Sequence, residues 1–157
     1  MAFLWFRRPG AHVREAPNVP EAPNASARDI GRWGEDVAVM HMMGLGWRIL
    51  DRNVRPCRRD LRCELDVVAF IPGSRQVVFV EVKTHGWRSA RASRLWAIDR
   101  RKKRNIMRAG ANWLMRRRWH GNFRFDVIEV YGRPGGASPE MDHMENVPLF
   151  PPNWRFW

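Results

Sequence analysis

The chain has 157 residues, enough for one compact domain with tails, and its 28 basic and 16 acidic residues give a formal charge of +12 at pH 7. Such a charge attracts polyanions, so nucleic acid is the expected class of partner. No apolar run approaches the ~20 residues of a membrane span, and the short apolar opening is followed, not preceded, by arginines, which argues against membrane insertion and secretion.

The two cysteines, Cys57 and Cys63, suggest a reduced, cytoplasmic location, because two thiols make no disulfide framework. A zinc site that combines them with His41 or His143 is disfavoured, since structural zinc needs four ligands with paired spacing.

The first predicted helix covers residues 30–43 and follows a segment, residues 1–28, that is rich in Pro, Ala and Asn and is predicted to be disordered. Within residues 30–43 the apolar residues recur at helical spacing, and Ser26 and Asp29 offer oxygens that can cap the start of the helix. Glu35 lies in the first turns, where the helix dipole favours a carboxylate, so its simplest interpretation is dipole stabilisation or solvent exposure.

Residues 47–54 are predicted to form a strand, and the loop of residues 55–62 after it carries four arginines, including Arg55, Arg58 and Arg59. This loop suits either a phosphate-binding role or a solvated run of charge.

Residues 63–70 and 77–83 are two apolar runs joined by Pro, Gly and Ser, a pattern that predicts an antiparallel hairpin. Side chains alternate along a strand, so Glu64 and Asp66 share one face of the first strand, and Glu81 and Lys83 share one face of the second. Charges within such apolar strands need compensation, because an unpaired buried charge costs several kcal/mol.

Two interpretations of these charges remain open on spacing alone. Asp66 and Glu81 could hold a divalent cation, Mg²⁺ or Mn²⁺, with Lys83 beside it, because hard cations take oxygen ligands. The alternative is a structural salt bridge between Lys83 and a carboxylate.

Residues 84–92 lack periodicity and are predicted to form a loop near this site. A second helix is predicted over residues 99–117, with an apolar stripe that includes Lys102 and a cationic stripe of Arg101, Arg104 and Arg108. The cationic stripe is either a solvated face or a track for a DNA backbone.

Residues 123–130 alternate as a last strand, in which Asp126 is predicted to be structural, by pairing with Arg124 or capping the sheet. A Gly/Pro loop and a closing segment, residues 141–150, follow without a predicted strand. The aromatic tail, residues 151–157, could pack on the domain or stack on bases.

Five blocks stand in the order expected for a known family: residues 31–35, 52–55, 64–69, 78–83 and 124–127. Over residues 29–150 the chain resembles the YraN-type family of uncharacterised bacterial proteins. That family is similar to the PD-(D/E)XK nucleases and, among these, to the archaeal Holliday-junction resolvases. The resemblance implies that Asp66 matches the lone acidic position, Glu81 and Lys83 the (D/E)XK pair, and Glu35 the carboxylate of the helix.

The resemblance further implies a metal shell of Asp66, Glu81 and Glu35, in which Lys83 orients the attacking water. The Val82 carbonyl is a further ligand candidate, and Glu64 either assists or binds a neighbouring arginine. Lys102 matches a recurrent lysine of the family and is therefore expected to be among the nucleic-acid-binding residues. Two positions depart from the pattern, since Cys63 replaces a glycine and His85 replaces a basic residue.

We therefore expect an α/β fold with a restriction-endonuclease-like core, a mixed central sheet flanked by helices in the order α-β-β-β-α-β. The expected function is that of a Mg²⁺-dependent DNA endonuclease acting on branched or repair DNA. The alternative is a non-catalytic nucleic-acid-binding module of the same fold. Because resolvase-like relatives act as dimers, the resemblance also implies a homodimer.

Overall fold

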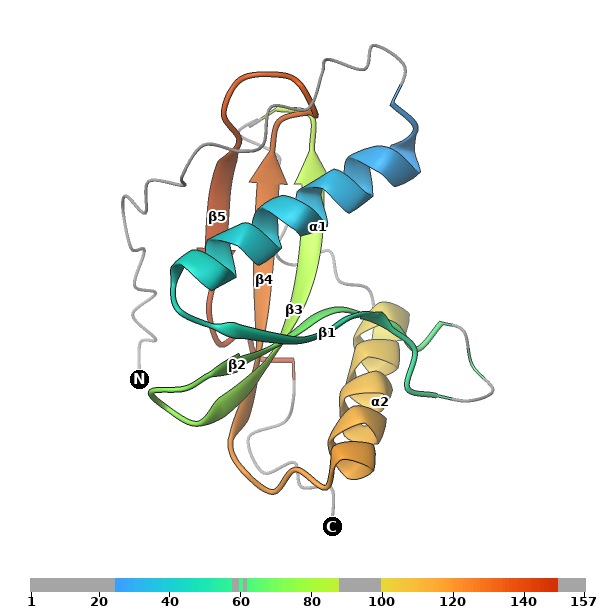
Figure 1. The fold of residues 1–157 in the computed structure, drawn as a ribbon. Coiled ribbons are helices and arrows are strands. Elements are labelled where there is room, and N and C mark those ends of the chain that lie inside the picture. The colour runs from blue at the N-terminus through green and yellow to red at the C-terminus, as the bar shows by residue number, and fades with distance from the viewer. Residues whose placement is uncertain (1–24, 58–59, 61, 88–99, 150–157) are drawn as a thin grey trace, which may run out of the picture.

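The computed structural model describes residues 25–57, 60, 62–87 and 100–149 of the chain (Figure 1). The elements in order are α1 (Ala27–Gly44), β1 (Arg48–Val54), β2 (Leu65–Ile71), β3 (Gln76–His85), α2 (Arg100–Arg117), β4 (Phe123–Tyr131) and β5 (Glu140–Met144). This order confirms the predicted α/β class and the sequence α-β-β-β-α-β, and it adds one strand at the end.

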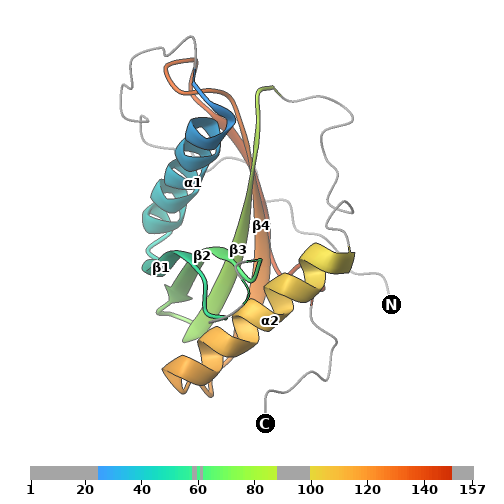
Figure 2. The ribbon, with the colours of Figure 1, turned by 90° about the vertical axis from the view of Figure 1, so that its right-hand side faces the viewer.

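Within the described residues, five strands form one mixed sheet in the order β1-β2-β3-β4-β5. Of these strands only β3 and β4 run parallel, and the helix between them in the chain provides the long connection that a parallel pair requires. The sheet separates two apolar cores, and Figure 2 shows α1 on one side of it and α2 on the other. The two faces of the sheet therefore meet different helices.

Helix α1 begins at Ala27, three residues before the predicted start, because Ser26 caps it. The Ser26 hydroxyl accepts from the Asp29 N–H at 3.2 Å, and the Asp29 carboxylate accepts from the Ser26 N–H at 3.2 Å. This reciprocal capping box satisfies two backbone donors of the first turn.

The predicted hairpin is confirmed, with β2 and β3 antiparallel and Ile71 paired with Gln76 beside the turn. Its first strand begins at Leu65, not at residue 63 as predicted, because the Cys63 N–H donates to the Asp60 carbonyl in a turn. Strand β3 continues to His85, so the predicted loop begins only at Gly86.

Strand β5 was not predicted, because its five residues, Glu-Met-Asp-His-Met, lack the apolar alternation of a strand. It forms by pairing antiparallel with β4, where His143 lies opposite Ile128. Tertiary pairing, not local preference, makes this segment a strand.

Gly34 lets α1 pack closely on β3, since a Cβ at this position would collide with the side chain of Thr84. This close approach places the next residue, Glu35, near the end of β3. None of the helices that the structure describes has the length and apolar character that a bilayer crossing needs. The predicted aromatic tail, residues 151–157, and most of the predicted disordered segment lie outside the described residues.

Candidate functional site

Asp66 and Glu81 meet across the β2–β3 ladder. Val67 pairs with Val80, so the same register carried one residue further places Asp66 opposite Glu81. The Val82 N–H donates to Asp66 Oδ2 at 2.9 Å and holds this carboxylate beside β3. The structure thus brings together the two carboxylates that were predicted from the sequence as site residues.

Two lysines bind the same oxygen of Glu81. Lys83 Nζ lies 2.7 Å and Lys102 Nζ 3.0 Å from Glu81 Oε1. The Glu81 side chain is only 3% exposed, whereas those of Lys83 and Lys102 are 44% and 36% exposed. Lys102, predicted among the nucleic-acid-binding residues, therefore reaches Glu81 from α2. It forms a charged cluster with Asp66, Glu81 and Lys83.

The charge of Asp66 is the least compensated in this cluster. Burial, and then the neighbouring Glu81, raise the pKa of Asp66 to about 7, against the lowering effects of the Val82 N–H and Lys102. Burial lowers the pKa of Lys102, but Glu81 and Asp66 outweigh burial and raise it above its usual value. The lysine stays charged, and Asp66 is poised to take up a proton or a cation near neutral pH.

Glu35 reaches the same region from α1 but binds elsewhere. Its Oε2 accepts from Asn53 Nδ2 at 2.7 Å and lies 3.9 Å from Arg52. Its charge also contributes to the raised pKa of Asp66. Sequence reasoning missed Asn53 as a partner, although it stands inside one of the family-like blocks.

The carboxylates of Asp66 and Glu81 have oxygen donors of the kind that could hold a metal ion. Among the residues that the structure describes, no group of three or more His, Cys, Asp or Glu side chains is placed to hold a metal ion. Asp66 and Glu81 fit a hard cation in donor chemistry, because both supply carboxylate oxygens and Asp66 is short of positive partners. Glu35 stands beside the pair and not within it.

Some of the arginines predicted to bind phosphate already pair with acidic side chains, and others are exposed. Arg55 pairs with Glu64 at 3.1 Å, and Arg108 pairs with Asp60 at 3.0 Å. Glu64 thus binds a neighbouring arginine, one of the two roles expected for it. Arg101 and Arg104 are exposed on α2. Arg58 and Arg59 lie outside the described residues.

A pocket of about 370 Å³ lies between α1 and the end of β3 and is bordered by Glu35. Its lining includes Ile30, Gly31, Glu35, Val82, Lys83 and Arg133. Two residues of the candidate site, Glu35 and Lys83, therefore also border a space that a ligand can enter.

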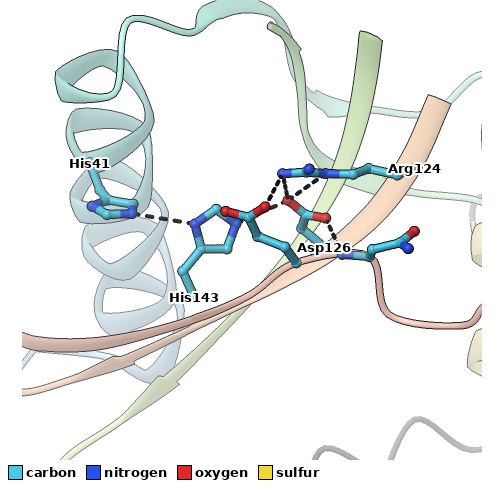
Figure 3. A network of polar contacts seen from close by, with 6 residues as sticks. His41, Arg124, Asp126 and His143 are labelled. Carbon is cyan, nitrogen blue, oxygen red and sulfur yellow. Dashed lines mark hydrogen bonds and ion pairs between the residues drawn. The ribbon is translucent and has the colours of Figure 1, made fainter. Parts of the chain in front are cut away.

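A second polar network lies on the α1 side of the sheet, around the fully buried Asp126 (Figure 3). The carboxylate accepts from Arg124 at 2.9 Å, from the Asn146 N–H at 2.8 Å and from His143 Nε2 at 3.0 Å. The predicted structural pairing of Asp126 with Arg124 is confirmed. On its other side, His143 Nδ1 lies 3.4 Å from His41 Nε2.

The histidines of this network could not have formed a zinc site with the cysteines. His143 contacts His41 of α1, whereas Cys57 and Cys63 are buried in the core on the α2 side. Burial, and then the neighbouring His143, lower the pKa of His41 below its usual value.

Comparison with known proteins gives a consistent match. The family model of "Uncharacterised protein family UPF0102" matches residues 34–130, a range that contains Glu35, Asp66, Glu81, Lys83 and Lys102. A "UPF0102 protein" of Pelobacter propionicus is 39% identical over 143 residues, covering 90% of this chain and 96% of that relative. A "UPF0102 protein" of Mycobacterium sp. (strain JLS) is 44% identical and one of Mycobacterium tuberculosis 38% identical; each covers 75% of this chain, and 84% and 91% of the respective relative.

Proposed function

From the premise that the chain belongs to the uncharacterised protein family UPF0102, the YraN-type family that its sequence resembles, we propose that it is a metal-dependent DNA endonuclease. One observation carries the proposal: Asp66 faces Glu81 in the sheet and has a pKa raised to about 7, while two lysines gather on Glu81. A carboxylate whose pKa is shifted by burial and by a neighbouring charge is typical of sites that bind a cation or transfer a proton.

The carboxylates of Asp66 and Glu81 would hold the metal, with the Val82 carbonyl and Glu35 as further oxygen donors close by. When bound, Mg²⁺ or Mn²⁺ supplies Lewis-acid polarisation of a phosphate and an activated water. A divalent cation would also relieve the repulsion between Asp66 and Glu81 that raises the Asp66 pKa.

Lys83 is the group that acts on the phosphate. Its side chain is 44% exposed, so its ammonium can turn from Glu81 toward a phosphate oxygen. Lys102 would then still bind Glu81 and keep that carboxylate in place. A positioned ammonium stabilises the negative charge that develops on the phosphate during hydrolysis.

The substrate class follows from charge. The formal charge of +12 attracts a polyanion. The exposed guanidinium groups of Arg101 and Arg104 extend along α2, the helix that carries Lys102. Such contacts to phosphates position nucleic acid without reading its bases.

The second candidate function is a non-catalytic nucleic-acid-binding module. It is favoured by the ion pairs themselves, because Lys83 and Lys102 both lie within hydrogen-bond distance of Glu81 and balance its charge without a metal. In this case the cluster stabilises the fold, and the basic surface alone accounts for binding.

Cleavage of branched, nicked, single-stranded and duplex DNA with and without Mg²⁺ or Mn²⁺ tests the proposal. We expect cleavage only with metal, and a loss of about a hundredfold or more in Asp66→Asn, Glu81→Gln and Lys83→Ala, as when one group that stabilises transition-state charge is removed. Lys103→Ala is the matched control, because Lys103 lies on α2 and its Nζ is directed to the Pro148 carbonyl.

Thermal unfolding of the same preparations separates the two functions. A catalytic Lys83 leaves the fold of Lys83→Ala intact while cleavage is lost. If the wild type binds DNA but cuts none of the panel, and Lys83→Ala melts well below it, the nuclease assignment is wrong and the binding module stands.

A further inference from the structure

The pocket between α1 and β3 has the size and chemistry of a site for one nucleotide. We propose that it holds an unpaired nucleotide of a DNA strand, so that the preferred substrates carry a strand end, a flap or a branch. This inference rests on the proposed function and specifies the substrate of the same site.

The volume of the pocket restricts what can enter. At about 370 Å³ it falls within the range of roughly 300–1,000 Å³ that is usual for small-molecule sites, and it has no room for a length of duplex. A nucleotide inside a duplex is stacked and paired, and must leave the stack before a pocket can enclose it. Nucleotides that are already unpaired enter without that cost.

The walls of the pocket match the parts of a nucleotide. Lys83 and Arg133 offer positive charge for phosphate oxygens, while Ile30 and Val82 offer apolar surface for a base or sugar. Gly86 also lines the pocket and lies close to the Arg133 guanidinium, since a Cβ there would be 3.4 Å from it. The next residue, Trp87, is 71% exposed, and an exposed indole ring suits stacking on a base.

Gly31 keeps the pocket open from the helix side. A glycine inside a helix costs roughly 0.5–1 kcal/mol relative to alanine, so it needs a reason. Packing does not supply one, because a Cβ at Gly31 would meet no atom within 4 Å. Since Gly31 lines the pocket, a side chain at this position would project into the space that a nucleotide would occupy.

The test fills the pocket and measures affinity by fluorescence anisotropy, with a chelator present to prevent cleavage. The probes are a blunt DNA hairpin and the same hairpin with an unpaired 5′ or 3′ tail. The pocket variant is Gly31→Phe. Its matched control is Gly44→Phe in the same helix, where an added Cβ also meets nothing within 4 Å but the position is exposed.

We expect the wild type to bind a tailed hairpin about tenfold more tightly than the blunt one, an affinity difference that one stacked base can supply. Gly31→Phe should bring this ratio close to one, and Gly44→Phe should preserve it. Arg133→Ala changes an exposed position and should also reduce this ratio. It tests the pocket assignment if Gly31→Phe does not fold.

Two results would overturn the pocket assignment while the nuclease proposal stands: equal affinity of the wild type for blunt and tailed hairpins, or an unchanged ratio in the folded pocket variants. A wild type that binds none of these DNAs, even at low salt, overturns the proposed function and the pocket assignment together.

Discussion

Asp126 and Asp66 are carboxylates on opposite faces of one sheet, and their surroundings compensate them to different extents. Asp126 is fully buried and accepts from an arginine, a histidine and a backbone N–H. Asp66 accepts from the Val82 N–H, and burial, followed by the facing Glu81 carboxylate, raises its pKa to about 7.

The difference distinguishes the structural carboxylate of Asp126 from that of Asp66, for which we propose a functional role. A buried charge is tolerated when hydrogen bonds and an opposite charge complete its surroundings, and breaking such a set is strongly destabilising. A carboxylate left short of partners costs stability, and proteins accept that cost chiefly where a site must bind or react. We therefore expect the two residues to respond to substitution in opposite directions.

Asp126→Ala should give the largest effect on stability, a loss of about 3 to 5 kcal/mol, because it leaves the largely buried Arg124 without its main partner. Urea unfolding at neutral pH measures the loss. Asp36→Ala is the control, since Asp36 also pairs with an arginine but at the exposed surface, where such a pair contributes about 0 to 1 kcal/mol. Equal losses in both variants would contradict the structural assignment of the Asp126 network.

Asp66→Asn should stabilise the protein at alkaline pH in the presence of a chelator. The folded-state pKa of about 7 lies above the usual 3.8, so the wild type loses stability as the pH rises from about 4 through 7. The variant lacks this loss and should be more stable by about 1 kcal/mol or more at pH 8.

Thermal unfolding across this pH range measures the Asp66 effect. Added Mn²⁺ should reduce the difference in stability between Asp66→Asn and the wild type. It should stabilise the wild type selectively, since a ligand stabilises the state that binds it. A variant less stable than the wild type at pH 8 would show that Asp66 is fully compensated, as Asp126 is.

His41→Gln should have the smallest effect on stability, and this effect should be seen at acidic pH. The pKa of His41 is lowered in the folded protein, so the unfolded chain binds its proton more readily, and the wild type loses stability as the pH falls below 6.5. The variant should lose less, as measured by unfolding between pH 7 and 5. His120→Gln, at an exposed histidine, should leave the acid sensitivity in place.

Local periodicity in the sequence predicted the elements whose contacts are local and the faces on which their side chains lie. Helical spacing located α1 and α2 to within three residues, and the alternation of β3 placed Glu81 and Lys83 on one face. These features follow from the 3.6-residue and two-residue repeats, which act over neighbouring positions of the chain. The hairpin of β2 and β3 was also predicted, but its register, and with it the facing of Asp66 and Glu81, came from the structure.

The fold, and not the local sequence pattern, establishes which distant groups meet. It brought Lys102 to Glu81, Asn53 to Glu35, and His41 to His143 across 102 positions of the chain. It also paired β5 with β4, although the composition of that segment predicts no strand. Such contacts depend on how far each element extends and on which face of the sheet each helix covers, and periodicity within a single element carries no information about either.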